Sequence, residues 1–403
     1  MYKQREIFGK LLKYMELPEI IAINGARQVG KTTLMKMLVE FLKNKGYDNI
    51  FFFDLERMEY LNLCNKGINE IISYIQAKKG NIDKGEKIYL FIDEIQYLDN
   101  PSSLLKLFYD EYKNSIKLIV SGSSSFAIKH KFKNSLVGRI LDVELYGLSF
   151  NEFLDFKGHE YNLGERSELA DKEISRFYEE YCLFGYYPQV VLADSKEQKE
   201  IYLNGIVDKY IYRDIRDLAN IRNIPKFNNL LSYLASQVCG LVNINEISNT
   251  LKISRQTLEE YLFILENTYI IKFLRPFYGN VRSELSKMPK VFFEDAGILN
   301  LLRNKRLNDI IEGQLFENSI YTMLRRKYPA DNIFFWRTAS KQEVDFIIRG
   351  ENILAREVKL GAQVKTPSGL TSFKAKYKNT DTGIITLAKN KSLSEKQFYP
   401  WEL

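Results

Sequence analysis

The chain has 403 residues, 45% of them hydrophobic and 27% charged, and a net charge of +7. This length predicts at least two domains, because a single hydrophobic core stops growing well below it. Three separated cysteines and two histidines argue against a disulfide framework, a zinc site or a Ser-His triad. The mild basic excess is compatible with an acidic partner such as DNA, although surplus surface lysine explains it more simply. We find neither a signal peptide nor a run of about 18 apolar residues, so we expect a cytoplasmic protein without a membrane span.

The first motif is the stretch EIIAINGARQVGKTTL at residues 19–34. A short apolar strand leads into a turn with two glycines, and a helix begins at Lys31. Their spacing is that of a phosphate-binding loop, in which glycines let backbone N–H groups approach phosphate oxygens. In this interpretation Lys31 neutralises the β and γ phosphates of ATP, and the Thr32 hydroxyl binds Mg²⁺. The predicted nucleotide-binding residues are Gly25, Ala26, Arg27, Gln28, Val29, Gly30, Lys31, Thr32 and Thr33.

The second motif is KIYLFIDE at residues 87–94, an apolar run that ends in two acids. Such a run is typical of a strand buried on both faces of a parallel sheet, and ligands bind at the carboxyl ends of these strands. We expect Asp93 to hold the magnesium ion through water and Glu94 to polarise the attacking water. An acidic helix cap is the alternative, but Asn100 and Pro101 already supply the cap of the next helix.

Two further strands are predicted at residues 49–54 and 117–125. The second ends in hydroxyl side chains, where a sensor of the γ phosphate would lie, and we assign that role to Ser123, with Ser121 as the other candidate. Runs of serine and glycine also simply form turns. Arg139 follows in SLVGRIL and could stabilise the transferred charge, either in its own subunit or in a neighbour of a homo-oligomer. A surface arginine is the alternative.

These motifs resemble a known family. The segments GARQVGKTTL, LFIDEIQYL, IVSGSSS and SLVGRILDVELYGLSFNEF are similar to those of the AAA-type P-loop ATPases of bacteria and archaea that carry a C-terminal domain of unknown function. The likeness continues in YRDI and KVFFEDAGILNLL, and so spans nearly the whole chain. It implies a catalytic-glutamate ATPase core at residues 1–150, with an additional strand between the two Walker strands. One departure is LFGYYP, where Gly185-Tyr186 replaces the usual Gly-Gly pair.

The middle of the chain is predicted to be helical and then to change character. Residues 151–225 have apolar positions at helical spacing, which indicates a helical lid on the ATPase core. Residues 226–303 predict a winged helix-turn-helix, with helices at 245–251 and 255–265 and a wing formed by strands at 269–274 and 290–294.

The second of these two helices is a candidate DNA-binding element. Ser254 is a natural cap for it, and Arg255, Gln256 and Thr257 at its start could reach bases or phosphates. Acidic residues follow at 259 and 260 and would repel a phosphate backbone, and a winged helix also serves as a packing module. Nucleic acid is therefore a possible partner, and a protein partner is the alternative.

Residues 304–403 show the order of a restriction-endonuclease-like domain: a helix bearing Glu317, a strand, and a hairpin at residues 341–360. If the hairpin turns at residue 351, Asp345 faces Glu357, and two facing carboxylates repel each other unless they share a magnesium ion. We therefore predict a metal site of Glu317, Asp345 and Glu357, with Lys359 on the same strand face as a catalytic residue that orients water. The alternative is an exposed hairpin in which Glu343 and Lys359 form a weak salt bridge.

The predicted architecture is α/β: an AAA-type P-loop NTPase with a parallel sheet, a helical lid, a winged helix-turn-helix and a C-terminal restriction-endonuclease-like domain. The predicted function is ATP hydrolysis with Mg²⁺ that controls a winged-helix and nuclease-like module acting on nucleic acid. The alternative is a nucleotide-dependent switch or scaffold for protein partners, with a catalytically inactive C-terminal domain.

Overall fold

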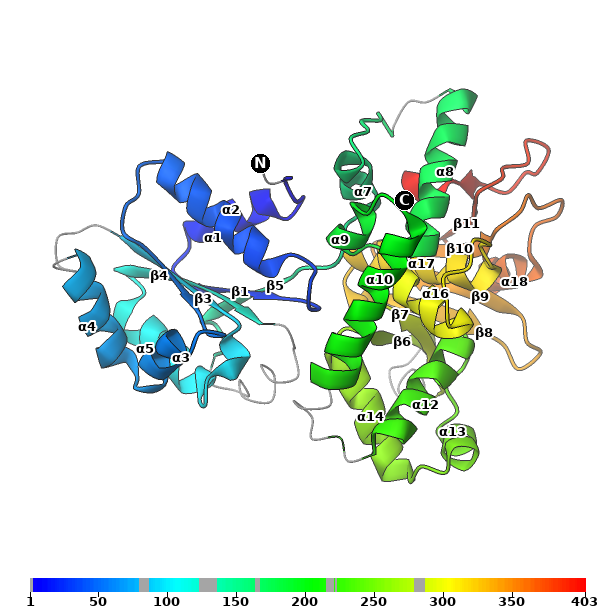
Figure 1. Ribbon diagram of the computed structural model, residues 1–403. Coiled ribbons are helices and arrows are strands. Elements are labelled where there is room, and N and C mark those ends of the chain that lie inside the picture. The colour runs from blue at the N-terminus through cyan, green and yellow to red at the C-terminus, as the bar shows by residue number, and fades with distance from the viewer. Residues whose placement is uncertain are drawn as a thin grey trace. The chain divides into compact units, whose positions relative to one another are not determined.

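The computed structural model describes residues 3–79, 87–122, 136–163, 167–214, 221, 223–278 and 287–403. The chain divides into two compact units, each with its own sheet (Figure 1). The first unit is formed by residues 1–147 together with 267–269, and the second by 148–266 and 270–403. No helix within these described residues is long and apolar enough to cross a membrane.

The first unit contains a five-stranded sheet in which all neighbouring strands are parallel. The strand order is β2-β3-β4-β1-β5. The strand β4 therefore lies between β1, which leads into the phosphate-binding loop, and β3, which ends at Asp93. The additional strand that the family resemblance implies is therefore present. Because the strands are parallel, their carboxyl ends meet at one edge, where ligands bind in open α/β sheets. The strands are β1 (Ile20–Asn24), β2 (Ile50–Asp54), β3 (Ile88–Asp93), β4 (Ile116–Gly122) and β5 (Ile140–Glu144).

Helices cover both faces of this sheet (Figure 1). The helices α1 (Phe8–Met15) and α2 (Lys31–Asn44) lie on one face, and α3 (Met58–Asn65), α4 (Ile68–Lys79) and α5 (Pro101–Tyr112) lie on the other. Alternate strand residues pack against the second group of helices and form its apolar core, as the alternation of strand side chains requires. The Asn100 side chain caps α5 by accepting from Ser103 N, as the sequence predicts.

The second unit contains most of the helices. Two helices joined by a tight turn, α13 and α14, form where the sequence predicts them: Lys252 adopts a left-handed conformation between them, and Ser254 Oγ accepts from Thr257 N at 3.2 Å. The helices are α7 (Phe150–Phe156), α8 (Glu168–Phe184), α9 (Pro188–Val191), α10 (Lys196–Ile206), the π-helical η3 (Val207–Asp214), α12 (Ile224–Ser236), α13 (Ile244–Leu251), α14 (Arg255–Asn267), α16 (Ala296–Asn304), α17 (Gly313–Lys327) and α18 (Ser368–Lys376).

A seven-stranded mixed sheet, in the order β12-β11-β10-β9-β8-β6-β7, runs through the second unit. The two strands predicted as a wing, β6 and β7, pair antiparallel, and β6 also pairs in parallel with β8 through Arg275 and Phe334. These strands therefore belong to one sheet with the C-terminal strands, and the finer division at residue 303 stays a prediction. The strands are β6 (Ile271–Pro276), β7 (Lys290–Phe293), β8 (Ile333–Arg337), β9 (Glu343–Ile348), β10 (Ile353–Lys359), β11 (Thr380–Thr386) and β12 (Gln397–Phe398).

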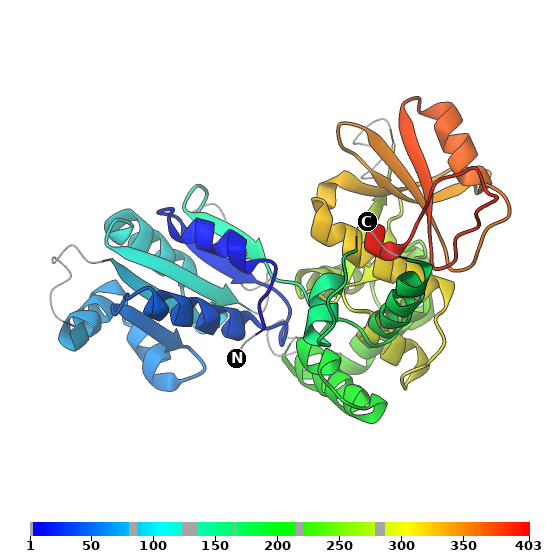
Figure 2. The ribbon, with the colours of Figure 1, turned by 90° about the horizontal axis from the view of Figure 1, so that it is seen from above.

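The helices α17 and α18 pack against this sheet, and α18 lies beside strands β9 to β11 in Figure 2. Phe373 of α18 contacts Trp336 edge to face, with ring centroids 5.3 Å apart. On α17, Tyr321 stacks on Phe292 of β7 at 4.3 Å. The contact between Tyr321 and Phe292 holds α17 and β7 close together and brings their polar residues to the same part of the sheet.

The Gly185-Tyr186 pair, where this chain departs from the family pattern, lies between α8 and α9. Gly185 has φ +81°, and a Cβ there would lie 2.3 Å from Asp295 Oδ1, so only glycine fits. Tyr186 donates its backbone N–H to Asp295 Oδ2 at 2.7 Å, and its buried ring packs 4.3 Å from that of Tyr181. The ring of Tyr186 thus fills part of the core, and its backbone hydrogen bond to Asp295 stabilises the turn between α8 and α9.

Candidate functional site

The phosphate-binding loop connects β1 to α2 at the carboxyl edge of the first sheet. Gly30 has φ +103°, and a Cβ on Gly25 would lie 2.2 Å from the carbonyl oxygen of Leu145, so glycine is required at both positions. Arg5 fixes the loop from outside, because its Nη1 donates to the Val29 carbonyl at 2.9 Å. The other predicted loop residues, Ala26, Arg27 and Gln28, lie between these points, and Thr33 is exposed in the first turn of α2.

Lys31 is buried at the start of α2, and its Nζ donates to the carbonyl oxygens of Gly25 and Ala26 at 3.1 and 2.9 Å. Burial lowers the pKa of Lys31 to about 8, although the carboxylates of Glu94 and Asp93 act in the opposite direction. Its hydrogen-bond partners are neutral carbonyls of the loop itself. A phosphate oxygen would give a stronger, charge-assisted hydrogen bond, so the ammonium group can exchange these partners for a nucleotide.

Thr32 and Asp93 meet although they come from different elements, α2 and β3. Thr32 Oγ1 donates to Asp93 Oδ2 at 2.6 Å, and Ser121 donates to the other carboxylate oxygen. A hydroxyl and a carboxylate are ligands that Mg²⁺ accepts together with water and substrate phosphates. The residues at this point therefore fit the predicted magnesium ion.

Glu94 directly follows β3 and has φ +57°, the left-handed region that non-glycine residues rarely adopt. Its backbone N–H donates to Ser121 Oγ at 3.3 Å, and Gln96 Nε2 donates to its carboxylate. The turn and these two partners hold the carboxylate beside Asp93. A carboxylate held in this way is suited to accept a proton, the role that the sequence predicts for Glu94.

A second polar site lies in the second unit, on the hairpin of β9 and β10. The pairs Ile348–Leu354 and Phe346–Arg356 give the register that the sequence predicts. The backbone pairing of β9 with β10 ends at Phe346 and Arg356. Beyond it the Asp345 side chain joins the two strands, because its Oδ2 accepts from Val358 N at 2.8 Å. Asp345 and its predicted neighbour Glu357 are both buried, so the two carboxylates do face the same region.

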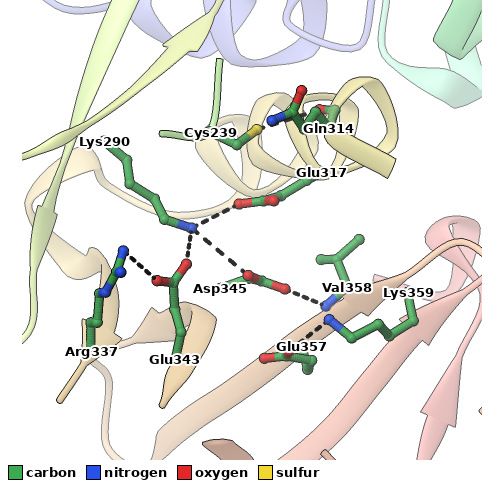
Figure 3. A network of polar contacts seen from close by, with 10 residues as sticks. All are labelled: Cys239, Lys290, Gln314, Glu317, Arg337, Glu343, Asp345, Glu357, Val358 and Lys359. Carbon is green, nitrogen blue, oxygen red and sulfur yellow. Dashed lines mark hydrogen bonds and ion pairs between the residues drawn. The ribbon is translucent and has the colours of Figure 1, made fainter. Parts of the chain in front are cut away.

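Lys290, the first residue of β7, supplies positive charge to these carboxylates (Figure 3). Its Nζ lies 2.6 Å from Glu343 Oε1, 3.0 Å from Glu317 Oε1 and 3.8 Å from Asp345 Oδ1. Burial alone lowers the pKa of Lys290, but the carboxylates of Glu317, Asp345 and Glu343 outweigh it and raise that pKa above its ordinary value. We call Lys290, Glu317, Glu343, Asp345, Glu357 and Lys359 the acid–lysine cluster.

The carboxylates of Glu317 and Glu357 have raised pKa values within this cluster. Burial, followed by the charge of Asp345, raises the pKa of Glu317 to about 8 and that of Glu357 to about 7. Lys359 donates to Glu357 Oε1 at 2.7 Å, which acts in the opposite direction on Glu357. Glu357 Oε2 is buried and has no hydrogen-bond partner.

The predicted metal site of Glu317, Asp345 and Glu357 does not form. Within the described residues, no three or more His, Cys, Asp or Glu side chains are grouped so as to hold a metal ion. The ammonium of Lys290 lies between Glu317 and Asp345, where it would repel a second cation, and Asp345 already uses one oxygen for Val358 N. Lys359 binds Glu357, so its predicted role in orienting a metal-activated water has no support here.

Comparisons with known proteins agree with the first site. Residues 17–154 match the AAA domain family, and residues 175–309 and 312–403 match two domains of unknown function, DUF8612 and DUF4143. The phosphate-binding loop and Asp93 both lie within the part of the chain that matches the AAA domain. An uncharacterized protein of Haemophilus influenzae is 29% identical over 357 residues, which are 87% of this chain and 84% of the relative.

Two further proteins are similar to this chain. An uncharacterized protein of Methanocaldococcus jannaschii is 28% identical over 359 residues, which are 87% of this chain and 77% of the relative. Among solved structures, a Walker-type ATPase of Pyrococcus abyssi is 16% identical with a TM-score of 0.46, and the match covers 75% of this chain and 96% of that one.

Two further site predictions concern Arg139 and Ser123. Arg139 directly precedes β5, where Ile140 pairs with Ile20, whereas the phosphate-binding loop follows Asn24 at the other end of β1. Four strand residues, or about 13 Å, separate these ends, and Arg139 binds Asp110 at 2.7 Å. A role of Arg139 at its own nucleotide is therefore wrong, and a role in a neighbouring subunit stays a prediction. Ser123 lies outside the described residues.

Two residues of these sites, Gln96 and Lys290, escape sequence reasoning. Gln96 holds Glu94 and lies within the quoted motif LFIDEIQYL. Ser121, named from the sequence as a candidate sensor of the γ phosphate, donates to Asp93 in the structure. Lys290 opens KVFFEDAGILNLL, but its carboxylate partners follow 27 or more residues later in the chain. The available signal is a lysine at the start of a run of buried apolar strand residues, which needs a counter-charge.

Proposed function

We propose that the first unit hydrolyses ATP with Mg²⁺ and that its nucleotide state controls the second unit, which binds a partner without cutting nucleic acid. The observation that carries the first part is the contact of Thr32 with Asp93 beside the buried ammonium of Lys31. The residues that would bind phosphate and magnesium thus come together from α2 and β3 at one edge of the sheet.

Each residue of the first site has a distinct task in this proposal. Lys31 leaves the loop carbonyls and binds the β and γ phosphates, together with the N–H groups at the start of α2. Thr32 and Asp93 hold the magnesium ion, which when bound neutralises charge that develops on the phosphate oxygens. Glu94 accepts a proton from the attacking water, in the position that Gln96 maintains.

ATP turnover of the full chain tests this part. We expect Glu94→Gln to reduce turnover by roughly 100-fold or more, the usual effect of removing a general base, while nucleotide binding is retained. Lys31→Ala should abolish binding and turnover together. Lys36→Ala, a change at an exposed lysine of the same helix, is the matched control and should leave turnover unchanged. Turnover that persists in both Lys31→Ala and Glu94→Gln would contradict the proposal.

The acid–lysine cluster supports a second unit that does not cleave nucleic acid. Metal-dependent cleavage needs carboxylates that share a cation and leave space for water, whereas Lys290 lies 3.0 Å from Glu317 and 3.8 Å from Asp345. We expect no cleavage of DNA or RNA by the full chain in Mg²⁺ or Mn²⁺. Cleavage by the wild type that both Asp345→Ala and Lys359→Ala abolish would establish the nuclease instead.

Nucleic acid is the proposed partner of the second unit, through the exposed start of α14. Arg255 there is 70% exposed, as a contact to phosphate requires, but it also binds Glu259 at 2.9 Å. This pair supports a protein partner as the second candidate, because the acid lowers the positive potential of the helix. Fluorescence anisotropy with labelled DNA, with and without ATP, distinguishes them. Binding that weakens in Arg255→Ala and with rising salt favours nucleic acid, and absence of binding favours a protein.

A further inference from the structure

We infer that the acid–lysine cluster is a closed cation site, in which the ammonium of Lys290 holds the place of a divalent cation among Glu317, Glu343 and Asp345. The inference goes beyond the proposed function, because it stands whether or not the first unit hydrolyses ATP. It concerns the chemistry of the second unit alone.

The ligand set around Lys290 is the kind that a hard divalent cation takes. Three carboxylates approach its Nζ from two elements, Glu317 from α17 and the other two, Glu343 and Asp345, from β9 (Figure 3). Oxygen ligands of this type bind Mg²⁺, Mn²⁺ or Ca²⁺ at about 2.0–2.6 Å. The ammonium of Lys290 takes this central position at 2.6 to 3.8 Å from the three carboxylates.

One carboxylate oxygen of the cluster has no hydrogen-bond donor within the described part of the chain. Glu357 is only 7% exposed, and its Oε2 is buried without a hydrogen-bond partner, while its Oε1 accepts from Lys359. Buried carboxylate oxygens are normally paired. Arg337 also binds Glu343, at 3.3 Å. The four carboxylates of the cluster therefore meet three cations, Lys290, Lys359 and Arg337, and one oxygen of Glu357 remains without a partner.

The backbone holds Lys290 in this place. Lys290 of β7 pairs with Leu274 of β6. The next residue of β7, Val291, accepts a hydrogen bond from Cys239 N with its carbonyl oxygen, at 2.8 Å. At its far end, Phe293 is fixed by the Asn318 side chain, which both accepts its N–H and donates to its carbonyl. These contacts fix the backbone of Lys290, and its side chain, which is only 3% exposed, reaches the carboxylates from there.

A purely structural ion pair is the competing explanation, and removing the lysine distinguishes the two. Lys290→Met keeps the length and apolar stem of the side chain but removes its charge. If the cluster is a closed cation site, the freed carboxylates draw together around a metal ion. Loss of stability is expected in either case, but if the cluster is only an ion pair, the variant gains no affinity for metal.

The test is Mn²⁺ binding to the full chain without nucleotide, measured by electron paramagnetic resonance. For wild type we expect no Mn²⁺ site that depends on Asp345. For Lys290→Met we expect about one Mn²⁺ per chain that depends on Asp345, bound at least roughly tenfold tighter than any Mn²⁺ that the wild type binds. Asp345→Asn in the Lys290→Met background should remove the gain. Asp93→Asn in the same background should not, which separates the cluster from the first unit. Lys290→Arg, which keeps the positive charge, should behave as wild type.

Two results would overturn the inference. One is Mn²⁺ binding by the wild type that Asp345→Asn abolishes, since the site would then be open. The other is a folded Lys290→Met variant without any gain in Mn²⁺ affinity. If Lys290→Met does not fold, Lys290→Gln retains hydrogen-bond donors to two carboxylates, and the wild-type arm decides the question by itself.

Discussion

Two lysines of this chain are buried beside acidic residues, yet they are held in opposite ways. Lys31 donates to the neutral carbonyls of Gly25 and Ala26, and burial lowers its pKa to about 8. Lys290 binds Glu317 and Glu343 directly, and its pKa is raised because these charges outweigh the effect of burial. Similar residue types thus produce one lysine that can exchange its partners and one that cannot.

The difference lies in the backbone that surrounds each lysine. Lys31 follows a loop with two required glycines, and the acids nearest to it, Asp93 and Glu94, are occupied by hydroxyl and amide donors. A ligand can therefore enter between the lysine and the acids. Lys290 lies on a paired strand and binds its acids directly, and Arg337 also binds one of them, Glu343, at 3.3 Å. A site of the first kind binds ligand, and a site of the second kind holds the fold together.

The largest predicted effect is the loss of ATP turnover in Lys31→Met, by at least about 100-fold, because the charge on the phosphates is no longer neutralised. The same change should leave the second unit unaffected. Both tryptophans, Trp336 and Trp401, lie in the second unit, so tryptophan fluorescence during urea unfolding reports on it alone. A shifted fluorescence midpoint in Lys31→Met would break the comparison between the two lysines.

Lys290→Met should show the reverse pattern. We expect the free energy of unfolding of the second unit to fall by about 3–5 kcal/mol, since the buried carboxylates lose their counter-charge, while ATP turnover changes little. Lys359→Met is the matched control, and its effect should be smaller because its side chain is 36% exposed. A loss in Lys359→Met equal to that in Lys290→Met would contradict the special role of Lys290.

The stability of the second unit should depend on pH through Glu317. Its folded pKa of about 8 lies above the ordinary value of 4.5, so the protonated form favours the folded state. The contribution is complete below pH 4.5 and is lost as the pH rises to about 8. We therefore expect a lower urea midpoint of tryptophan fluorescence at pH 8.5 than at pH 6, a difference that Glu317→Gln reduces. A higher wild-type midpoint at alkaline pH would contradict this assignment.

The smallest predicted effect is that of Arg139→Ala. Since Arg139 lies at the far edge of the sheet and binds Asp110 there, turnover at high dilution should match that of the wild type. If the arginine acts on a neighbouring subunit, the ATP turnover of the variant should drop below that of the wild type only as the protein concentration rises. Titrating turnover against protein concentration for both proteins measures this, and a loss at every concentration would restore a role within the same subunit.

Much of the first unit was predictable because its chemistry is local in sequence. The strand, loop and helix from residue 19 to 34 are contiguous, and the second acidic motif ends a strand whose burial its composition shows. The hairpin register was also predictable, since Ile348 and Leu354 match across a short turn. These are patterns within one or two adjacent elements.

The identity of the cation in the second unit was not predictable in this way. Asp345 and Glu357 indicate a need for positive charge, but the hairpin alone does not say whether a metal or a lysine supplies it. Lys290 meets them only because β6 joins β7 to the C-terminal sheet and α17 packs on β7. Such a long-range arrangement leaves no periodic signal in the sequence.

The most direct test of this account is Mn²⁺ binding by the wild-type protein with and without ATP. We predict that Mn²⁺ binds tightly only when ATP is present, that Asp93→Asn and Lys31→Ala weaken this binding, and that Asp345→Asn leaves it unchanged. Mn²⁺ binding in the absence of ATP that disappears in Asp345→Asn would show that Lys290 does not close the second site, and would contradict the account.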